Sequence, residues 1–189
     1  MARQILFSDS ISINKIRDPK LDTWVETTLD KHKKQSDSAS ISNVGGYQTK
    51  DVLDEESIKL FGQYAALAMR DFTNKKFKYV MHNMWINENY KYSYNKYHNH
   101  SDCHFAGVYY HKVPKDSGFL EFQRTDATAF LNLSTHFQTS DTHTGYRINP
   151  YAGMLVVFPS SYGHSVHQSM SDEPRVSVAF NFSIIGVNK

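Results

Sequence analysis

Residues 175–182 read Arg175-Val176-Ser177-Val178-Ala179-Phe180-Asn181-Phe182, and this alternation is typical of a β-strand. Successive side chains of a strand point to opposite faces of its sheet. The four even-numbered residues, all Val or Phe, therefore share one face, and we expect that face to pack against helices. Arg175 and Ser177 lie on the other face and are expected to point into the interior of the protein.

The same two-residue period recurs along the second half of the chain, between turns rich in Pro, Gly, Asp and Ser. Strands are predicted at 79–87, 105–111, 119–123, 154–158, 164–170 and 175–185, with an opening strand at 5–16. Many short strands separated by such turns favour a two-sheet β-sandwich of jelly-roll type.

Two amphipathic helices are predicted before the strand-rich part. Apolar residues repeat at helical spacing between Leu21 and His32, and a second helix begins at Asp54, a suitable N-cap. We expect both helices to cover one face of a sheet. Residues 33–51 are predicted to form a loop, and so is the tyrosine-rich segment 90–97. We expect a single domain over 1–189, with an N-terminal strand and covering helices at 1–77 and a catalytic core at 78–189.

The composition is that of an ordinary globular protein, with 40% hydrophobic residues, 21% charged residues and a formal net charge of +2. That charge is too small to indicate a nucleic-acid partner or an anionic membrane. No apolar stretch is long enough to span a bilayer, and the first seven residues lack the apolar region of a signal peptide. The single cysteine, Cys103, excludes an internal disulfide. We therefore expect a cytoplasmic protein.

A candidate metal site is indicated by His100-Ser101-Asp102, followed about sixty residues later by His164. Two histidines and one carboxylate form the facial triad that holds non-haem Fe(II) and leaves positions open for substrate and oxygen. On an extended segment, the side chains of His100 and Asp102 would fall on the same face. Polar residues in a surface loop are the alternative explanation for this pattern.

The inward position of Arg175 supports a site that also binds an anion. Burying a guanidinium without an anionic partner is costly. A bound dicarboxylate would supply that partner, and the Ser177 hydroxyl could donate a second hydrogen bond. An ion pair with one of the protein's own acidic residues is the alternative.

Two groups of motifs, in the same order along the chain, resemble a family of 2-oxoglutarate/Fe(II) oxygenases. Many of its members come from bacteria and marine phages, and the family is distantly similar to prolyl hydroxylases. The resemblance covers about residues 85–183. Its motifs are Tyr97-His98-Asn99-His100, Phe105-Ala106-Gly107-Val108-Tyr109-Tyr110, Ser117-Gly118-Phe119-Leu120-Glu121-Phe122, Gly153-Met154-Leu155-Val156-Val157-Phe158-Pro159-Ser160 and Arg175-Val176-Ser177-Val178-Ala179-Phe180-Asn181.

The resemblance implies a double-stranded β-helix, the cupin-like form of the jelly roll, that binds Fe(II) and 2-oxoglutarate. It implies that 2-oxoglutarate is decarboxylated to succinate while a C–H bond of the main substrate is oxidised. Carried over by position, His164 is the distal metal ligand. Arg175, helped by Ser177, would hold the far carboxylate of 2-oxoglutarate, and Tyr110 matches a tyrosine that reaches the same carboxylate in prolyl hydroxylases.

The ligand set stays open between two arrangements. The wider superfamily writes its first motif His-x-Asp/Glu, which favours His100 and Asp102. Members of the resembled family share both histidines of the His98-x-His100 pattern, which favours a three-histidine site of His98, His100 and His164.

Three functions compete at this point. The first is a dioxygenase that uses Fe(II) and 2-oxoglutarate and hydroxylates a small-molecule or peptidyl substrate, for example a free or peptidyl amino acid such as proline. The second is a cupin-like three-histidine metalloenzyme without 2-oxoglutarate, and the third a non-catalytic jelly-roll protein that binds a ligand or belongs to a virion. Oligomeric state also stays open, with a homodimer as one option, and a phage-encoded protein would act in the host cytoplasm.

Overall fold

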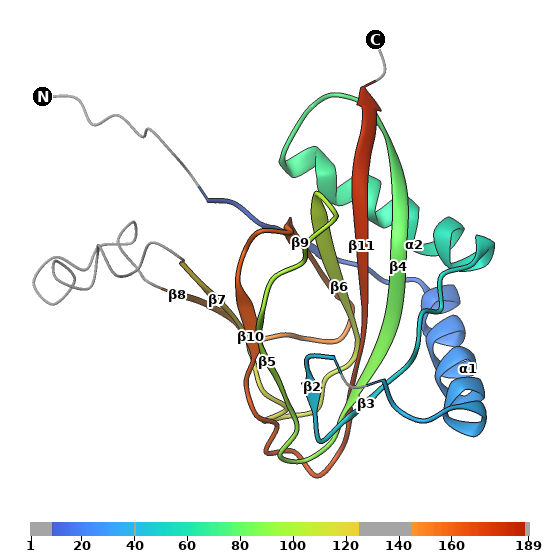
Figure 1. Ribbon diagram of the computed structural model, residues 1–189, viewed down its shortest axis with the longest axis vertical. Coiled ribbons are helices and arrows are strands. Elements are labelled where there is room, and N and C mark those ends of the chain that lie inside the picture. Colours follow the sequence, from blue (N-terminus) through green and yellow to red (C-terminus); the bar gives the residue numbers. More distant parts are fainter. Residues whose placement is uncertain (1–8, 40, 125–144, 188–189) are drawn as a thin grey trace, which may run out of the picture.

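The computed structural model describes residues 9–39, 41–124 and 145–187, and its elements are shown in Figure 1. The helices are α1 (Pro19–Gln35), α2 (Glu55–Ala68) and a 3-10 turn at Met69–Asp71. The strands are β1 (Ser12–Lys15), β2 (Asn43–Val44), β3 (Tyr47–Gln48), β4 (Phe77–Asn89), β5 (Tyr94–His98), β6 (Phe105–Lys112), β7 (Leu120–Gln123), β8 (Gly145–Ile148), β9 (Met154–Pro159), β10 (His164–Val166) and β11 (Arg175–Val187).

The strands form two antiparallel sheets that face each other. The major sheet has the order β1-β9-β6-β11-β4-β3, and the minor sheet has the order β2-β5-β10-β7-β8. β2 pairs with β5 of the minor sheet, while β3 pairs with β4 of the major sheet. The β2–β3 hairpin therefore joins the edges of the two sheets on one side. The predicted mainly-β fold with N-terminal helices and a jelly-roll core is confirmed.

The helices cover the outer face of the major sheet (Figure 1), as predicted. The Asp18 carboxylate accepts a hydrogen bond from the Lys20 backbone N–H and so caps α1, and Asp54 forms a capping box with Ser57 at α2. Trp24 of α1 packs edge-on against Phe61 of α2. The ring centroid of Phe61 in turn lies 5.9 Å from that of Phe180 of β11. The apolar face of β11 thus lies under the helices, and its other face is left to line the space between the sheets.

Five segments differ from the sequence prediction. The predicted opening strand at 5–16 is a strand only over Ser12–Lys15, and residues 5–8 lie outside the described part. The predicted loop at 33–51 contains the last turn of α1 and the β2–β3 hairpin, and the predicted tyrosine-rich loop contains most of β5. Strand β8 was not predicted, and β10 ends at Val166. Two-residue strands are too short to show a period, which explains why the hairpin escaped prediction.

Within the ranges described above, no helix is long and apolar enough to cross a membrane.

Candidate metal centre

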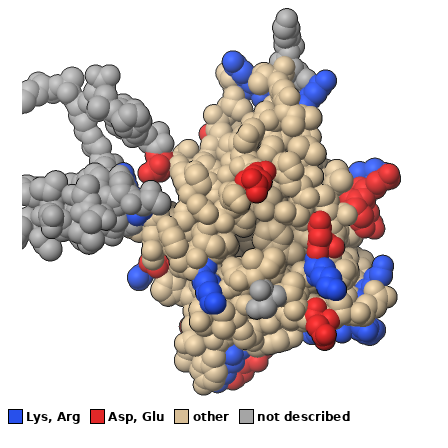
Figure 2. Space-filling view, viewed as in Figure 1, with Lys and Arg blue, Asp and Glu red and all other residues tan. Residues whose placement is uncertain are grey.

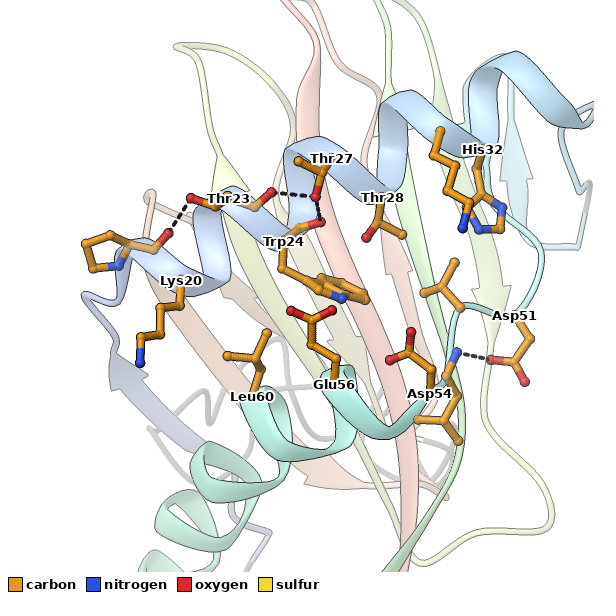
Figure 3. A pocket seen from close by; sticks show the side chains of 14 residues that line it. Lys20, Thr23, Trp24, Thr27, Thr28, His32, Asp51, Asp54, Glu56 and Leu60 are labelled. Atoms are coloured by element: carbon orange, nitrogen blue, oxygen red, sulfur yellow. Dashed lines mark hydrogen bonds between the residues drawn. The ribbon is translucent and has the colours of Figure 1, made fainter.

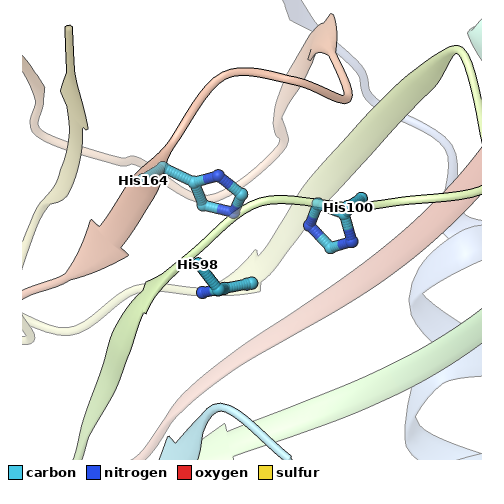
Figure 4. Close-up of side chains that lie close together, drawn as sticks. All are labelled: His98, His100 and His164. Atoms are coloured by element: carbon cyan, nitrogen blue, oxygen red, sulfur yellow. The ribbon is translucent and has the colours of Figure 1, made fainter. Parts of the chain in front are cut away.

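Three histidines converge between the sheets (Figure 4): one nitrogen of each of His98, His100 and His164 lies within 4.8 Å of the others. His98 ends β5, and His164 begins β10 and is its register partner across the antiparallel pair. His100 follows two residues later, and its ring stacks on that of His164 with centroids 5.2 Å apart. Sheet pairing therefore brings together side chains that are more than sixty positions apart in the chain.

Hydrogen bonds to backbone carbonyls orient two of the three rings. Nδ1–H of His98 donates to the Lys96 carbonyl at 2.7 Å, and Nδ1–H of His164 donates to the Tyr162 carbonyl at 2.9 Å. Because a carbonyl only accepts, each ring must carry its proton on Nδ1, which leaves the lone pair of Nε2 free. Fixing the tautomer through the second nitrogen is how proteins prepare histidines for metal ligation.

The surroundings of the cluster keep its imidazoles neutral. Burial, with His98 nearby adding in the same direction, lowers the pKa of His164 to about 3 and that of His100 to about 4. Burial also lowers the pKa of His98. Phe158 and Phe122 pack against His164, which is only 5% exposed. Neutral imidazole is the form that binds a metal, so the chemistry of this donor set fits a divalent transition metal.

We expect the metal-free protein to lose stability between pH 7 and pH 5. A histidine with a lowered pKa in the folded state is protonated first in the unfolded chain, so its contribution is complete above about pH 6.5 and is lost as the pH falls towards the folded-state pKa. For the buried His164 this amounts to about 2 kcal/mol at pH 5. Urea unfolding at pH 7 and pH 5 measures the loss of unfolding free energy, and this loss should be smaller in His164→Leu. An equal loss in wild type and variant would contradict the expectation.

Asp102 does not join the histidine cluster. The prediction that it shares a face with His100 assumed an extended segment, but Asp102 has a φ of 65°, which turns the chain. Its side chain is exposed and accepts a hydrogen bond from the Ser101 hydroxyl at 3.3 Å. Among the described residues, the group that could hold a metal ion contains the three histidines alone.

Arg175 is buried at the other end of the space between the sheets, with 2% of its surface exposed. Its Nη1 donates to the backbone carbonyls of Ser117 at 2.9 Å and Gly118 at 3.4 Å, while its Nε has no partner within the described part of the chain. Burial lowers the pKa of its guanidinium. Both of these acceptors are backbone carbonyls, so the described residues offer the guanidinium no internal ion pair.

Tyr110 and Ser177 lie beside Arg175 and face the same space. They are register partners on β6 and β11, and both are buried. The Tyr110 ring centroid lies 6.0 Å from the guanidinium carbon, and burial raises the pKa of the Tyr110 hydroxyl. Asn87 of β4 pairs with Ser177 from the opposite side, and its Oδ1 is buried without a partner among the described residues. Arg175, Ser177, Tyr110 and Asn87 thus form a polar end to the pocket.

One pocket connects this polar end to the histidines. The residues that line it are Ser42, Trp85, Asn87, Asn95, His98, His100, Ala106, Gly107, Val108, Tyr110, Leu120, Phe158, His164, Val166, Arg175, Ser177 and Ala179. Trp85 and Asn87 belong to the predicted strand at 79–87, whereas Ser42 and Asn95 lie in segments that were predicted as loops. Ser42 comes from a predicted loop, and nothing in its sequence context indicates a role.

A larger groove of about 680 Å³ lies between α1 and α2 (Figure 3), on the far side of the major sheet. Trp24, Glu56 and Leu60 line it together with threonines of α1. It contains neither a histidine cluster nor a buried cation without an anionic partner. We therefore assign the chemistry to the smaller pocket inside the sandwich.

A family model described as "Putative 2OG-Fe(II) oxygenase" matches residues 83–181, which is 99 of the 189 residues. No curated protein matches the chain.

Solved structures resemble the fold at low sequence identity. A Pseudomonas putida prolyl-4-hydroxylase matches with 15% identity over 93% of each chain and a TM-score of 0.60. An oxidoreductase of the 2OG-Fe(II) oxygenase family from Burkholderia pseudomallei matches with 15% identity over 83% of this chain and 76% of its own, also with a TM-score of 0.60. HygX from Streptomyces hygroscopicus, solved with nickel, 2-oxoglutarate and hygromycin B, matches with 10% identity over 93% of this chain and 83% of its own, with a TM-score of 0.63.

Proposed function

Because the chain belongs to the 2OG-Fe(II) oxygenase family, we propose that its three clustered histidines hold the iron and that Arg175 binds the far carboxylate of 2-oxoglutarate. The protein is an oxidoreductase that depends on Fe(II) and 2-oxoglutarate. The observation that carries the residue assignments is the joint presence, in one pocket, of three neutral imidazoles and a buried guanidinium that has no acidic partner among the described residues.

The proposed metal ligands are His98, His100 and His164, with Nε2 as the ligand atom of His98 and His164. The hydrogen bonds on the Nδ1 atoms of His98 and His164 support this choice of atom. Asp102 is the alternative third ligand and would require the 100–102 segment to change its backbone conformation.

The proposed co-substrate residues are Arg175, Ser177 and Tyr110, joined by Asn87. The Arg175 guanidinium and the hydroxyls of Ser177 and Tyr110 would donate hydrogen bonds to one carboxylate of 2-oxoglutarate. The Asn87 amide could add a further hydrogen bond, because Asn87 is the register partner of Ser177 on the neighbouring strand β4. Since the pocket walls exclude most water, these hydrogen bonds would be stronger than on a surface.

Bound iron and 2-oxoglutarate together supply the oxidation of a substrate C–H bond by O₂, coupled to conversion of 2-oxoglutarate to succinate and CO₂. The chain contributes by keeping the imidazoles neutral, holding 2-oxoglutarate at a fixed distance from them, and limiting water at the reacting atoms through Phe122 and Phe158. We propose that the main substrate is a small molecule or a peptidyl residue and that the reaction is hydroxylation. The prolyl-4-hydroxylase and the HygX structure with bound hygromycin B, both similar in fold, support these two substrate classes.

The test is 2-oxoglutarate-dependent succinate formation by purified protein with Fe(II). We expect slow formation without a main substrate, loss of signal without iron, and inhibition by N-oxalylglycine, an analogue of 2-oxoglutarate. Absence of succinate together with absence of 2-oxoglutarate binding in calorimetry would rule the proposal out.

The second function that the sequence left open, a three-histidine enzyme without 2-oxoglutarate, agrees with the ligand geometry but not with the family. The non-catalytic jelly-roll protein disagrees with the family too.

We further propose a cytoplasmic protein without a nucleic-acid partner, which the lone cysteine and the small net charge support. A homodimer is compatible with everything described.

Gly118→Ala is expected to weaken 2-oxoglutarate binding by moving the carbonyls that hold Arg175. Gly118 has a φ of 82°, and a Cβ there would lie 2.2 Å from the His167 carbonyl oxygen. Strain of this kind costs about 1–3 kcal/mol in unfolding free energy. Calorimetry with 2-oxoglutarate and urea unfolding measure the two effects. Gly186→Ala is the control, because a Cβ there meets no atom within 4 Å. Equal behaviour of both variants would contradict the role of Gly118.

A further inference from the structure

A buried asparagine lies opposite Arg175 on the neighbouring strand. Asn89 of β4 is the register partner of Arg175 of β11, and the two residues are 0% and 2% exposed. Asn89 follows the pocket residue Asn87 by two positions, so its side chain also points into the space between the sheets. The Cβ atoms of directly opposed strand residues are about 4.5–5.5 Å apart. The Asn89 amide and the Arg175 guanidinium are therefore neighbours inside the sandwich.

The two side chains carry complementary groups. Nδ2 of Asn89 donates to Oδ1 of Asn95 at 3.2 Å, and Nδ2 of Asn95 donates to the Ser42 hydroxyl at 3.2 Å, which ties the amide to the minor sheet. Oδ1 of Asn89 accepts no hydrogen bond within the described part of the chain, and Nε of Arg175 donates none. An unused acceptor thus lies beside an unused donor, and leaving either one buried without a partner is costly.

The acidic side chains close to Asn89 and Arg175 in the sequence are directed elsewhere. Each of them pairs with a lysine. The pairs are Glu88–Lys33, Asp172–Lys91 and Glu173–Lys112, with N–O distances of 2.6, 2.7 and 3.1 Å. On the face seen in Figure 2, acidic side chains likewise lie at the surface, several of them beside basic ones. The residue that the fold places opposite Arg175 is instead a neutral amide.

The neutrality of this amide matters for an anion site. A carboxylate at position 89 would form an internal ion pair with the guanidinium and would compete with any anionic ligand of Arg175. An amide oxygen can accept a hydrogen bond from the guanidinium and orient it. Because the amide has no charge, the positive charge of Arg175 stays available for a stronger, charge-assisted hydrogen bond to a ligand.

We propose that Asn89 is a positioning residue for Arg175: it orients the guanidinium and, being neutral, leaves the positive charge to the far carboxylate of 2-oxoglutarate. Asn89 thereby sets the preference of the site for a keto acid with a second carboxylate. This inference rests on the proposed function, because that function assigns Arg175 to 2-oxoglutarate.

The test compares two metal-chelating ligands, 2-oxoglutarate and oxalate, by calorimetric titration of Mn(II)-loaded protein. Oxalate lacks a far carboxylate and so cannot reach Arg175. Asn89→Asp should lower the affinity for 2-oxoglutarate about tenfold or more, the effect of one hydrogen bond to a charged group, and leave that for oxalate unchanged. Asn89→Leu, which removes the amide without adding charge, should lower the affinity for 2-oxoglutarate about threefold to tenfold.

Asn83→Asp is the matched control, because it adds the same charge on the same strand. Asn83 is the register partner of Asn181, and its Oδ1 accepts from Asn181 Nδ2 at 2.9 Å, a bond that aspartate keeps. The ratio of the two affinities should stay at the wild-type value in this variant. A purely structural role of Asn89 would change both affinities together.

Two kinds of failure are distinguishable. If wild type binds 2-oxoglutarate but Asn89→Leu or a folded Asn89→Asp binds it equally well, or loses oxalate to the same extent, the inference is wrong while the proposed function stands. If wild type loaded with Mn(II) binds no 2-oxoglutarate, the proposed function is wrong, and the inference with it. Should Asn89→Asp not fold, the leucine variant alone decides.

Discussion

His98→Ala is expected to lower the affinity for Fe(II) by about a hundredfold or more and to abolish 2-oxoglutarate-dependent succinate formation. Sites built from four protein ligands bind zinc with about 10–16 kcal/mol, so one ligand is worth about 3 kcal/mol. In this protein the loss would remove one of three converging nitrogens and leave a two-ligand site. Competition with a chelating dye measures the metal affinity, and succinate analysis measures the activity.

Asp102→Asn is the informative partner of that variant. Asparagine tolerates the left-handed backbone conformation of Asp102, so the substitution removes the charge without adding strain. We expect the metal affinity of Asp102→Asn to stay within about threefold of wild type. Losing even one hydrogen bond to a charged group would change the affinity more than about tenfold. His82→Ala, on an exposed histidine of β4, controls for the loss of any imidazole. Metal loss in Asp102→Asn with retention in His98→Ala would instead establish the two-histidine, one-carboxylate triad.

The residues that sequence patterns predicted well are those on long, regular strands. The alternation along β11 was sufficient to send its Val and Phe side chains under the helices and Arg175 into the sandwich, because the period of a strand fixes the face of every residue. The meeting of the His98–His100 segment with His164 was also predicted, from the resemblance and the spacing of the motifs. The structure adds the reason, which is the register between β5 and β10.

Features that depend on single backbone torsions or on backbone atoms could not be predicted. One left-handed residue, Asp102, is enough to break the extended geometry on which the facial triad was based. The carbonyls of Ser117 and Gly118 hold Arg175, and a carbonyl has no signature in a sequence. Ser42 reaches the pocket only because the two-residue strand β2 docks on β5. In each case the deciding contact is tertiary, whereas the sequence signal is local.

Arg175→Met is expected to reduce the affinity for 2-oxoglutarate by about 30-fold to 4,000-fold while leaving the affinity for the metal unchanged. Truncating one partner of a buried charge pair costs about 2–5 kcal/mol, most of it from the charge left unpaired, here the carboxylate of 2-oxoglutarate. Calorimetric titration of the metal-free protein with Mn(II), and then of the Mn(II)-loaded protein with 2-oxoglutarate, measures the two affinities. Arg147→Met is the control, because Arg147 pairs with Glu121 and its side chain is 65% exposed.

The stability of the metal-free Arg175→Met variant separates a binding role from a structural one. The variant loses two hydrogen bonds to carbonyls, but it also removes a buried guanidinium that has no acidic partner in the described structure, and methionine fills similar space. These effects oppose each other, so we expect the free energy of unfolding to stay within about 1 kcal/mol of wild type. Removing one member of an internal ion pair would instead cost about 3–5 kcal/mol. A loss of that size, with 2-oxoglutarate binding intact, would mean that Arg175 supports the fold and that another residue binds the co-substrate.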